Sequence, residues 1–219
     1  MSEYDTFARD FSATRQHAWP EFDMFLPLLR RGDRVLDLGC GNGRLREFIN
    51  KSTSQQVDES TSKKIIPEGN YFGFDISTEL LRIAEKKFPH DHFFRGDFSC
   101  TLPFGGDNFN AVVAIASFHH LLSRKPQILF LQECIRILKP GSVLFMTTWQ
   151  LPRKFFWQNI LRGRLKNWII PFGADRHSRT YRRTSEKELT RLLKKTGFEV
   201  VSVRLFQQRN FVAIARKPK

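Results

Sequence analysis

The 219-residue chain lacks any apolar run that approaches the roughly 18 residues needed to cross a membrane. Its first ten residues, MSEYDTFARD, are charged from the start and lack the apolar core of a secretory signal peptide. The hydrophobic fraction is 41%, as in globular proteins, and the length suits one sizeable core. The sequence therefore predicts a single cytoplasmic domain over residues 1–219, without a transmembrane segment.

Cysteine is also scarce. The three cysteines, Cys40, Cys100 and Cys134, are far apart in the sequence and form no C-x-x-C pair or Cys/His cluster. This pattern argues against a disulfide framework and against a zinc site. We expect reduced thiols and no bound metal.

Acidic residues are rare in the last third of the chain. Residues 1–150 hold 18 Lys and Arg and 18 Asp and Glu, whereas residues 151–219 hold 18 and 4, so the whole net charge of +14 lies there. A segregated positive charge is typical of proteins that face phosphate, either in nucleic acid or on a membrane surface. The alternative is a basic surface that contacts only solvent.

Short β-type runs alternate with helical ones, which is the order of an α/β fold with a mainly parallel, doubly wound sheet. We expect strands at residues 34–38, 71–75, 92–95, 111–116, 143–148, 198–205 and 211–215. We expect helices at residues 21–29, 43–50, 77–88, 126–138 and 185–196. The short turn before the last strand predicts a C-terminal antiparallel hairpin.

Two further segments interrupt or precede this alternation. Residues 51–70 are polar, rich in Ser and without periodicity, which predicts a flexible insertion after the first strand and helix. Residues 1–30 are expected to form an N-terminal lid or helix, and such segments often close over a bound cofactor.

The stretch LDLGCGNG, residues 36–43, follows an apolar run and precedes a helical pattern. A glycine turn between a strand and a helix lets backbone N–H groups face a ligand beyond the carboxyl end of the sheet. The spacing G-x-G-x-G is tighter than that of dinucleotide enzymes, so it suits a ligand that ends in an amino acid. Asp37 is placed to hold the ammonium group of such a ligand, directly or through water.

Two more acids follow strands. Asp75 ends the second strand and is expected to bind ribose hydroxyls, while Asp97 ends the third and is expected to bind the adenine amino group. Phe98 would then pack on the adenine ring. A turn or capping role is the alternative for each acid alone, but three acids at successive strand ends favour a ligand site.

The motifs LDLGCGNG, GFDIS, RGDF, AIASFHHL and ILKPGS, in this order, resemble those of class I S-adenosylmethionine-dependent methyltransferases over residues 33–148. The resemblance implies a Rossmann-like sheet of seven strands that ends in the antiparallel hairpin. It also implies S-adenosyl-L-methionine as cofactor. The implied cofactor-binding residues are Asp37, Gly39, Cys40, Gly41, Gly43, Asp75, Ile76, Asp97, Phe98 and Ser117.

The flanking segments, such as YDTFARDFSATRQHAWP and RTYRRTSEKEL, are similar to those of the eukaryotic tRNA wobble-uridine methyltransferases. That family esterifies a carboxymethyl group on uridine and uses a small activator subunit. The resemblance implies tRNA as a partner, bound through the basic C-terminal third. The implied acceptor-side residues are Tyr4, Arg15, Trp19, His119, Trp149, Arg179 and Tyr181, of which we assign Arg15, His119, Arg179 and Tyr181 to catalysis.

The acceptor decides which chemistry is needed. A carboxylate is already a nucleophile at neutral pH, so cations such as Arg15 and Arg179 need only hold it in place. An amine, hydroxyl or ring carbon would need a base, for which His119 or His120 is the candidate. Either His could instead cap the strand end or pack beneath the site.

Residues 151–183 combine Arg and Lys with the aromatic residues Phe155, Phe156, Trp157, Trp168 and Phe172. Cations can neutralise phosphates and aromatic rings can stack on unpaired bases, so these residues suit a substrate-binding insertion for structured RNA. The same residues could form an amphipathic helix on a membrane surface, as in a lipid or quinone methyltransferase. For the chain as a whole, a third possible function is a module that binds the methyl donor without catalytic activity.

Overall fold

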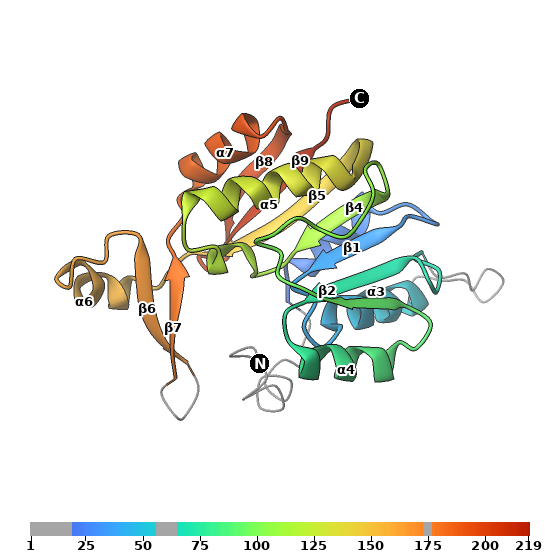
Figure 1. The fold of residues 1–219 in the computed structure, drawn as a ribbon, viewed down its shortest axis with the longest axis horizontal. Helices are drawn as coiled ribbons and strands as arrows, with labels where there is room; N and C mark the ends of the chain where they lie inside the picture. Colours follow the sequence, from blue (N-terminus) through green and yellow to red (C-terminus); the bar gives the residue numbers. More distant parts are fainter. Residues whose placement is uncertain (1–18, 56–64, 173–176) are drawn as a thin grey trace.

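The computed structural model describes residues 19–55, 65–172 and 177–219 (Figure 1). It contains a seven-stranded sheet in the order β3-β2-β1-β4-β5-β9-β8. Strands β1 to β5 run parallel to one another, and β9 runs antiparallel to both β5 and β8. The strands of this sheet are β1 (Val35–Leu38), β2 (Tyr71–Asp75), β3 (His92–Arg95), β4 (Phe109–Ala114), β5 (Leu138–Trp149), β8 (Glu199–Phe206) and β9 (Asn210–Arg216). The predicted fold class is confirmed.

Helices cover both faces of the sheet (Figure 1). One face packs on α5 (Arg124–Ile137) and α7 (Glu186–Lys195), and the other on α2 (Phe22–Phe25) and α3 (Arg44–Gln55). Helix α4 (Thr78–Lys87) follows β2. Both β1 and β2 are buried along their whole length, because a parallel sheet between two helical layers has no face open to water.

The antiparallel pairing of β9 decides what lies at the carboxyl edge of the sheet. Trp149, at the end of β5, pairs with Asn210, at the start of β9. The turn between β8 and β9, residues 207–209, therefore lies at the same edge as the carboxyl ends of the parallel strands. This edge is where doubly wound folds bind their ligands.

The structure corrects several predicted boundaries. Helix α3 continues to Gln55, five residues into the predicted insertion, and Ile66 from the same segment is fully buried in the core. The predicted helix over residues 21–29 is instead α2 followed by a 3₁₀ turn, η2 (Leu26–Leu28), which contains Pro27. Residues 1–18, which include Tyr4 and Arg15, and residues 56–64 lie outside the described part of the chain.

Residues 151–183, which we call the arm, were not assigned elements from the sequence. They form η5 (Arg153–Phe155), α6 (Phe156–Ile160) and a two-stranded antiparallel sheet of β6 (Asn167–Phe172) and β7 (His177–Arg182). The described part of the arm is therefore not one continuous amphipathic helix, and some of its apolar residues, such as Trp168 and Ile170, pack in a small core of their own. Within the described ranges, no helix has the length and apolar character to cross a membrane.

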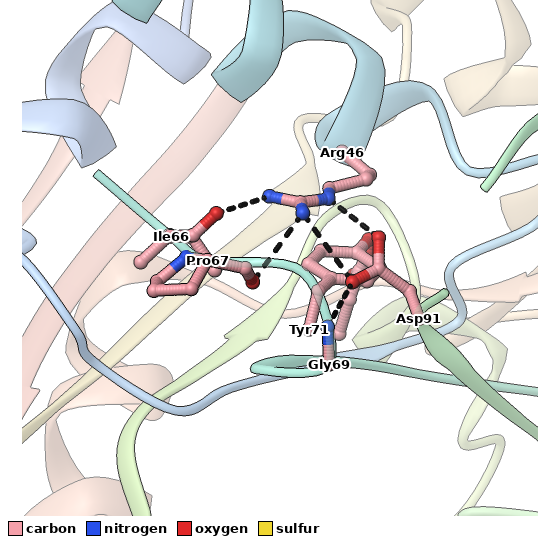
Figure 2. A network of polar contacts seen from close by, with 7 residues as sticks. Arg46, Ile66, Pro67, Gly69, Tyr71 and Asp91 are labelled. Carbon is pink, nitrogen blue, oxygen red and sulfur yellow. Dashed lines mark hydrogen bonds and ion pairs between the residues drawn. The ribbon is translucent and has the colours of Figure 1, made fainter. Parts of the chain in front are cut away.

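A buried ion pair fastens the edge of the sheet to α3 (Figure 2). The Arg46 Nε atom donates to Asp91 Oδ2 at 2.6 Å, and these two side chains are 1% and 2% exposed. Arg46 also donates to the carbonyl oxygens of Ile66 and Pro67, at 3.0 and 3.5 Å, and Gly69 N donates to Asp91 Oδ1 at 3.1 Å. One guanidinium therefore joins α3 to the segments that precede β2 and β3.

Removing this guanidinium is expected to destabilise the fold. In Arg46→Met the Asp91 carboxylate stays buried without its partner, which costs about 3–5 kcal/mol and lowers the melting temperature by about 10 °C. The control is Lys51→Ala, which removes an exposed ion pair with Glu47 and is expected to cost less than about 0.5 kcal/mol. Equal melting temperatures for the two variants would contradict this account.

Candidate active site

A cavity of about 880 Å³ opens at the carboxyl edge of the sheet. Its wall is built from the loops after β1 to β5, the β8–β9 turn and strand β7. Most residues predicted for the site line it: Gly39, Cys40, Gly41, Asp75, Ile76, Asp97, Phe98, Ser117, His119, Arg179 and Tyr181, together with Trp19 and Trp149. Asp37 and Gly43 are not part of the lining, and Arg15 lies outside the described residues.

Two of the three glycines in LDLGCGNG are required by close packing within the protein. Gly39 has φ +82°, and a Cβ atom there would lie 2.2 Å from Ser117 Oγ. The Ser117 hydroxyl donates to the carbonyl oxygen of Leu38 at 2.8 Å, which ties the end of β4 to the end of β1. Gly43 has φ +77°, and a Cβ there would lie 2.9 Å from the Phe88 ring. These glycines let the cavity floor form by close approach of loops and helices.

Asp75 organises the loop that follows β1. Its Oδ2 accepts from Gly41 N at 2.9 Å, and its Oδ1 accepts from Ser77 N at 2.9 Å. The carboxylate is buried and lines the cavity. Because each carboxylate oxygen can accept more than one hydrogen bond, Asp75 can also take ligand hydroxyls while it holds Gly41.

Asp97 and Phe98 form the part of the wall next to the glycine loop. Asp97 Oδ1 accepts from Ser99 N at 2.8 Å, which holds the turn after β3. The Phe98 ring packs edge-on against Phe130, with centroids 5.7 Å apart, and is half-buried. This arrangement presents one flat apolar face and one exposed carboxylate to a ligand.

Asp37 lies beneath the glycine loop rather than in the cavity. Its Oδ2 accepts from the Tyr71 hydroxyl at 2.5 Å, and both side chains are buried. Burial is the main reason that the pKa of Asp37 is raised to about 7, and the charge of Asp75 adds to it. Near neutral pH this carboxyl group is therefore partly protonated.

Four rings gather at the other end of the cavity, an aromatic cluster of His119, His120, Trp149 and Tyr181. His119 stacks on Trp149, with centroids 5.7 Å apart and planes at 17°. Tyr181 lies 5.2 Å from each of the other three rings. Trp149 comes from the end of β5 and Tyr181 from β7, so the arm supplies part of this wall.

The proton position on His119 follows from its neighbours. Its Nδ1 accepts from the backbone N–H of Trp149 at 3.2 Å, so Nδ1 carries no proton. Burial and the adjacent His120 lower the pKa of His119 well below its ordinary value. The ring is therefore neutral with its proton on Nε2, where it can donate a hydrogen bond.

Arg179 brings a positive charge to the same end. Its side chain is buried, comes from β7 and lines the cavity. Burial lowers the pKa of His120 to about 4, and the charge of Arg179 contributes to this shift. A neutral imidazole with so low a pKa is a poor proton acceptor, so this end of the cavity favours anions and offers only a weak base.

Sequence reasoning missed the strained backbone at the cavity. Ala116, Gln207 and Gln208 have φ values of 51°, 45° and 54°, and all three line the cavity. Residues other than glycine, Asn or Asp seldom adopt this left-handed region, at a cost of about 1–2 kcal/mol each. The same wall contains a buried contact in which Asn210 Nδ2 donates to Glu21 Oε1. No local sequence signal marks these positions.

A protein-family model described as "Methyltransferase domain" matches residues 11–203. The chain belongs to this methyltransferase family. The predicted membership of the methyltransferases is therefore confirmed, and solved structures that share this fold include SAM-dependent methyltransferases. Among the described residues, no group of three or more His, Cys, Asp or Glu side chains could hold a metal ion.

Two curated relatives point to different acceptors. A tRNA (carboxymethyluridine(34)-5-O)-methyltransferase from Arabidopsis thaliana is 30% identical over 146 residues, which is 67% of this chain and 31% of that protein. The demethylmenaquinone methyltransferase of Thermotoga maritima is 28% identical over 215 residues, 93% of this chain and 86% of that protein. The chain spans about a third or less of the length of three curated tRNA methyltransferases that it matches.

Solved structures agree with the fold. A SAM-dependent methyltransferase from Methanosarcina mazei superposes with a TM-score of 0.71 at 22% identity, covering 92% of this chain and 98% of that one. A Haloferax volcanii methyltransferase, solved in complex with the Trm112 methyltransferase activator, gives 0.69 at 18% identity, covering 100% and 99%.

Asp75→Ala is expected to weaken donor binding. The substitution removes an acceptor for the donor's hydroxyls and also frees Gly41 N, so affinity for S-adenosylhomocysteine should fall at least about tenfold. Calorimetry measures this, with circular dichroism to verify the fold. Glu79→Ala, which removes an exposed carboxylate paired with Arg82 on α4, is the control. Unchanged affinity in Asp75→Ala would show that the donor does not contact this carboxylate.

The low pKa of His120 predicts how stability depends on pH. Since the folded-state pKa of about 4 is below the ordinary value of 6.5, the unfolded chain binds more protons between these values. The contribution of His120 is complete above pH 6.5 and is lost as pH falls toward 4. The stability difference between wild type and His120→Gln should therefore shrink by up to about 1.4 kcal/mol per pH unit below 6.5. A constant difference in chemical denaturation from pH 7.5 to 4.5 would contradict this.

Proposed function

We propose that this chain methylates a carboxylate carried by tRNA, and that the product is the methyl ester of a carboxymethyl group at or near the wobble uridine. The observation that carries the proposal is the acceptor end of the cavity. It combines the buried cation Arg179 with His119, whose Nε2–H donates and whose Nδ1 is occupied by Trp149 N. Such an end holds an anionic oxygen and has no strong base.

The donor half of the cavity fits S-adenosylmethionine. Gly39 and Gly41 line it without side chains, Asp75 offers carboxylate oxygens to ribose hydroxyls, and Phe98 offers a face for adenine. We assign Cys40 and Gly41 to the methionine end, Ile76 and Asp97 to the adenosine end, and Ser117 to the floor between them. Asp37 and Gly43 support the loop and do not contact the donor.

When bound, S-adenosylmethionine supplies a methyl group already activated by a positively charged sulfur. An ionised carboxylate is nucleophilic at neutral pH, so no residue of this chain has to remove a proton from it. The work left to the protein is alignment and exclusion of water. Arg179 and His119 Nε2–H hold the acceptor oxygens, and the rings of Trp149 and Tyr181 shield them.

Charge and similarity support tRNA as the carrier of this carboxylate. The net charge of +14 lies entirely in residues 151–219, which suits a phosphate-rich partner. Relatives about 30% identical are named as carboxymethyluridine methyltransferases of position 34. The expected location, as predicted from the sequence, is the cytoplasm.

The second candidate is methylation of a quinone or other small molecule. The similarity to the demethylmenaquinone methyltransferase favours it, because that match covers most of both chains. Methylation of a ring carbon or hydroxyl calls for a base, and the neutral His119 and His120 serve this poorly. We therefore place it second.

We also propose that a small activator subunit assists the chain. Strand β3 is one of the two outer strands of the seven-stranded sheet, and Phe94 on it is exposed. An exposed strand edge offers unpaired backbone groups to a partner. Support also comes from the Haloferax volcanii methyltransferase, which was solved with such an activator. Activity assays should therefore be run with and without an activator of this kind.

The Arg179→Ala variant tests the proposal. Loss of a charge-assisted contact to the acceptor is expected to lower turnover on tRNA about 10- to 100-fold, while S-adenosylhomocysteine affinity stays within about twofold. One assay follows labelled methyl groups from S-adenosylmethionine into tRNA whose carboxymethyl groups do not yet carry the methyl ester. A parallel assay follows the label into a demethylated quinol. Labelling of the quinol alone would overturn the tRNA proposal, and a loss confined to donor affinity would remove Arg179 from the acceptor side.

A further inference from the structure

The arm exposes large apolar side chains to solvent. Trp157 is 68% exposed, Leu161 82% and Leu165 66%. Trp157 and Leu161 are four residues apart, and Leu161 N donates to the Trp157 carbonyl oxygen at 3.0 Å, so they share one face of a helical turn. Exposed cations lie close to them in the sequence. We call this set the docking face: Lys154, Trp157, Leu161, Arg162, Leu165 and Lys166.

The docking face is fixed to the acceptor end of the cavity. Asn159, on the buried side of α6, donates through Nδ2 to the Phe155 carbonyl oxygen and accepts through Oδ1 from Ile169 N, both at 2.9 Å. The bond from Ile169 N fastens α6 to β6, and β6 pairs with β7, which carries Arg179 and Tyr181 into the cavity. Figure 1 shows the arm projecting from the main sheet. A partner on the docking face would therefore be held at a set distance from the reacting group.

Charge indicates the chemistry of that partner. Residues 151–172 contain five Lys and Arg and no Asp or Glu. We propose that the docking face binds the single-stranded RNA next to the methylated nucleotide, with Trp157 stacked on an unpaired base and Arg162 and Lys166 on phosphates. The inference rests on the proposed function. A base that enters an enzyme cavity must leave its stack, which exposes the faces of its neighbours.

The arrangement of the docking face favours RNA over a membrane surface. Binding to lipid scales with a continuous buried apolar area, and α6 has only five residues. In the sequence the apolar residues alternate with cations, since Arg162 follows Leu161 and Lys166 follows Leu165. Stacking on a base needs a single ring beside a cation, so this mixed surface is adequate for RNA.

The test compares affinities for a hairpin RNA with an unpaired loop, measured by fluorescence anisotropy over a range of salt. Trp157→Ala should weaken binding about 5- to 100-fold, and Trp157→Phe should retain most of the affinity because a ring remains. Arg162→Ala should reduce the slope of log affinity against log salt by about 0.7, the value for one phosphate contact on single strands. The matched control is Val201→Ala, which shortens an exposed apolar residue on β8 outside the arm.

The outcomes separate this inference from the proposed function. All variants should bind S-adenosylhomocysteine like the wild type, which shows that they are folded. If the wild type binds RNA and Trp157→Ala binds equally well, the docking face is wrong while the proposed function stands. A wild type with no RNA affinity overturns the proposed function. If that wild type binds anionic phosphatidylserine vesicles and Trp157→Ala does not, the face is a membrane surface, and the RNA inference is overturned.

Discussion

The contact between Gly39 and Ser117 is the constraint on which the site depends. The loops after β1 and β4 leave the sheet side by side, and they meet because Gly39 has no Cβ to oppose the Ser117 hydroxyl. That hydroxyl bonds to the end of β1, while Asp75 reaches across from β2 to the amide of Gly41. Three strand ends are thus joined into one floor. The glycines of this turn serve the architecture of the protein as much as they serve a ligand.

Electrostatics divides the cavity that stands on this floor. The donor half is lined by carboxylates whose oxygens already accept backbone hydrogen bonds, which holds Asp75 and Asp97 in fixed positions. The acceptor half holds a buried cation among uncharged rings, because burial keeps His119 and His120 neutral. A positive sulfonium donor and an anionic acceptor oxygen suit these two halves. In the reaction that we propose, the site promotes methyl transfer mainly by alignment, with little demand for proton transfer.

The sequence predicted the sheet well because its strands are short apolar runs bounded by Gly, Asp and Pro. The strands at residues 71–75 and 92–95 were predicted to the residue. The arm was missed because its cations and rings follow no single period: Trp168 and Ile170 face a small core of their own, while Trp157 faces water. The rest of β6, Pro171 included, carries no clear strand alternation.

The features of the site also divide into those that the sequence predicts and those that it does not. Motif position was sufficient to place Gly39, Asp75 and Ser117 on the cavity, because each directly follows or ends a strand. The protonation state of His119 could not be predicted, since it depends on the N–H of Trp149, 30 residues away. The left-handed turn at Gln207 and Gln208 was also beyond prediction, because glutamine has no preference for that backbone region.

The chemical nature of the transferred methyl group tests the central claim most directly. If the cavity holds a carboxylate, methyl label that enters tRNA from S-adenosylmethionine forms an ester. Mild alkali should then release the label as volatile methanol, and nucleoside mass spectrometry should show the mass of an esterified carboxymethyluridine. Label that resists alkali and stays on a base nitrogen, ring carbon or ribose oxygen would contradict the account.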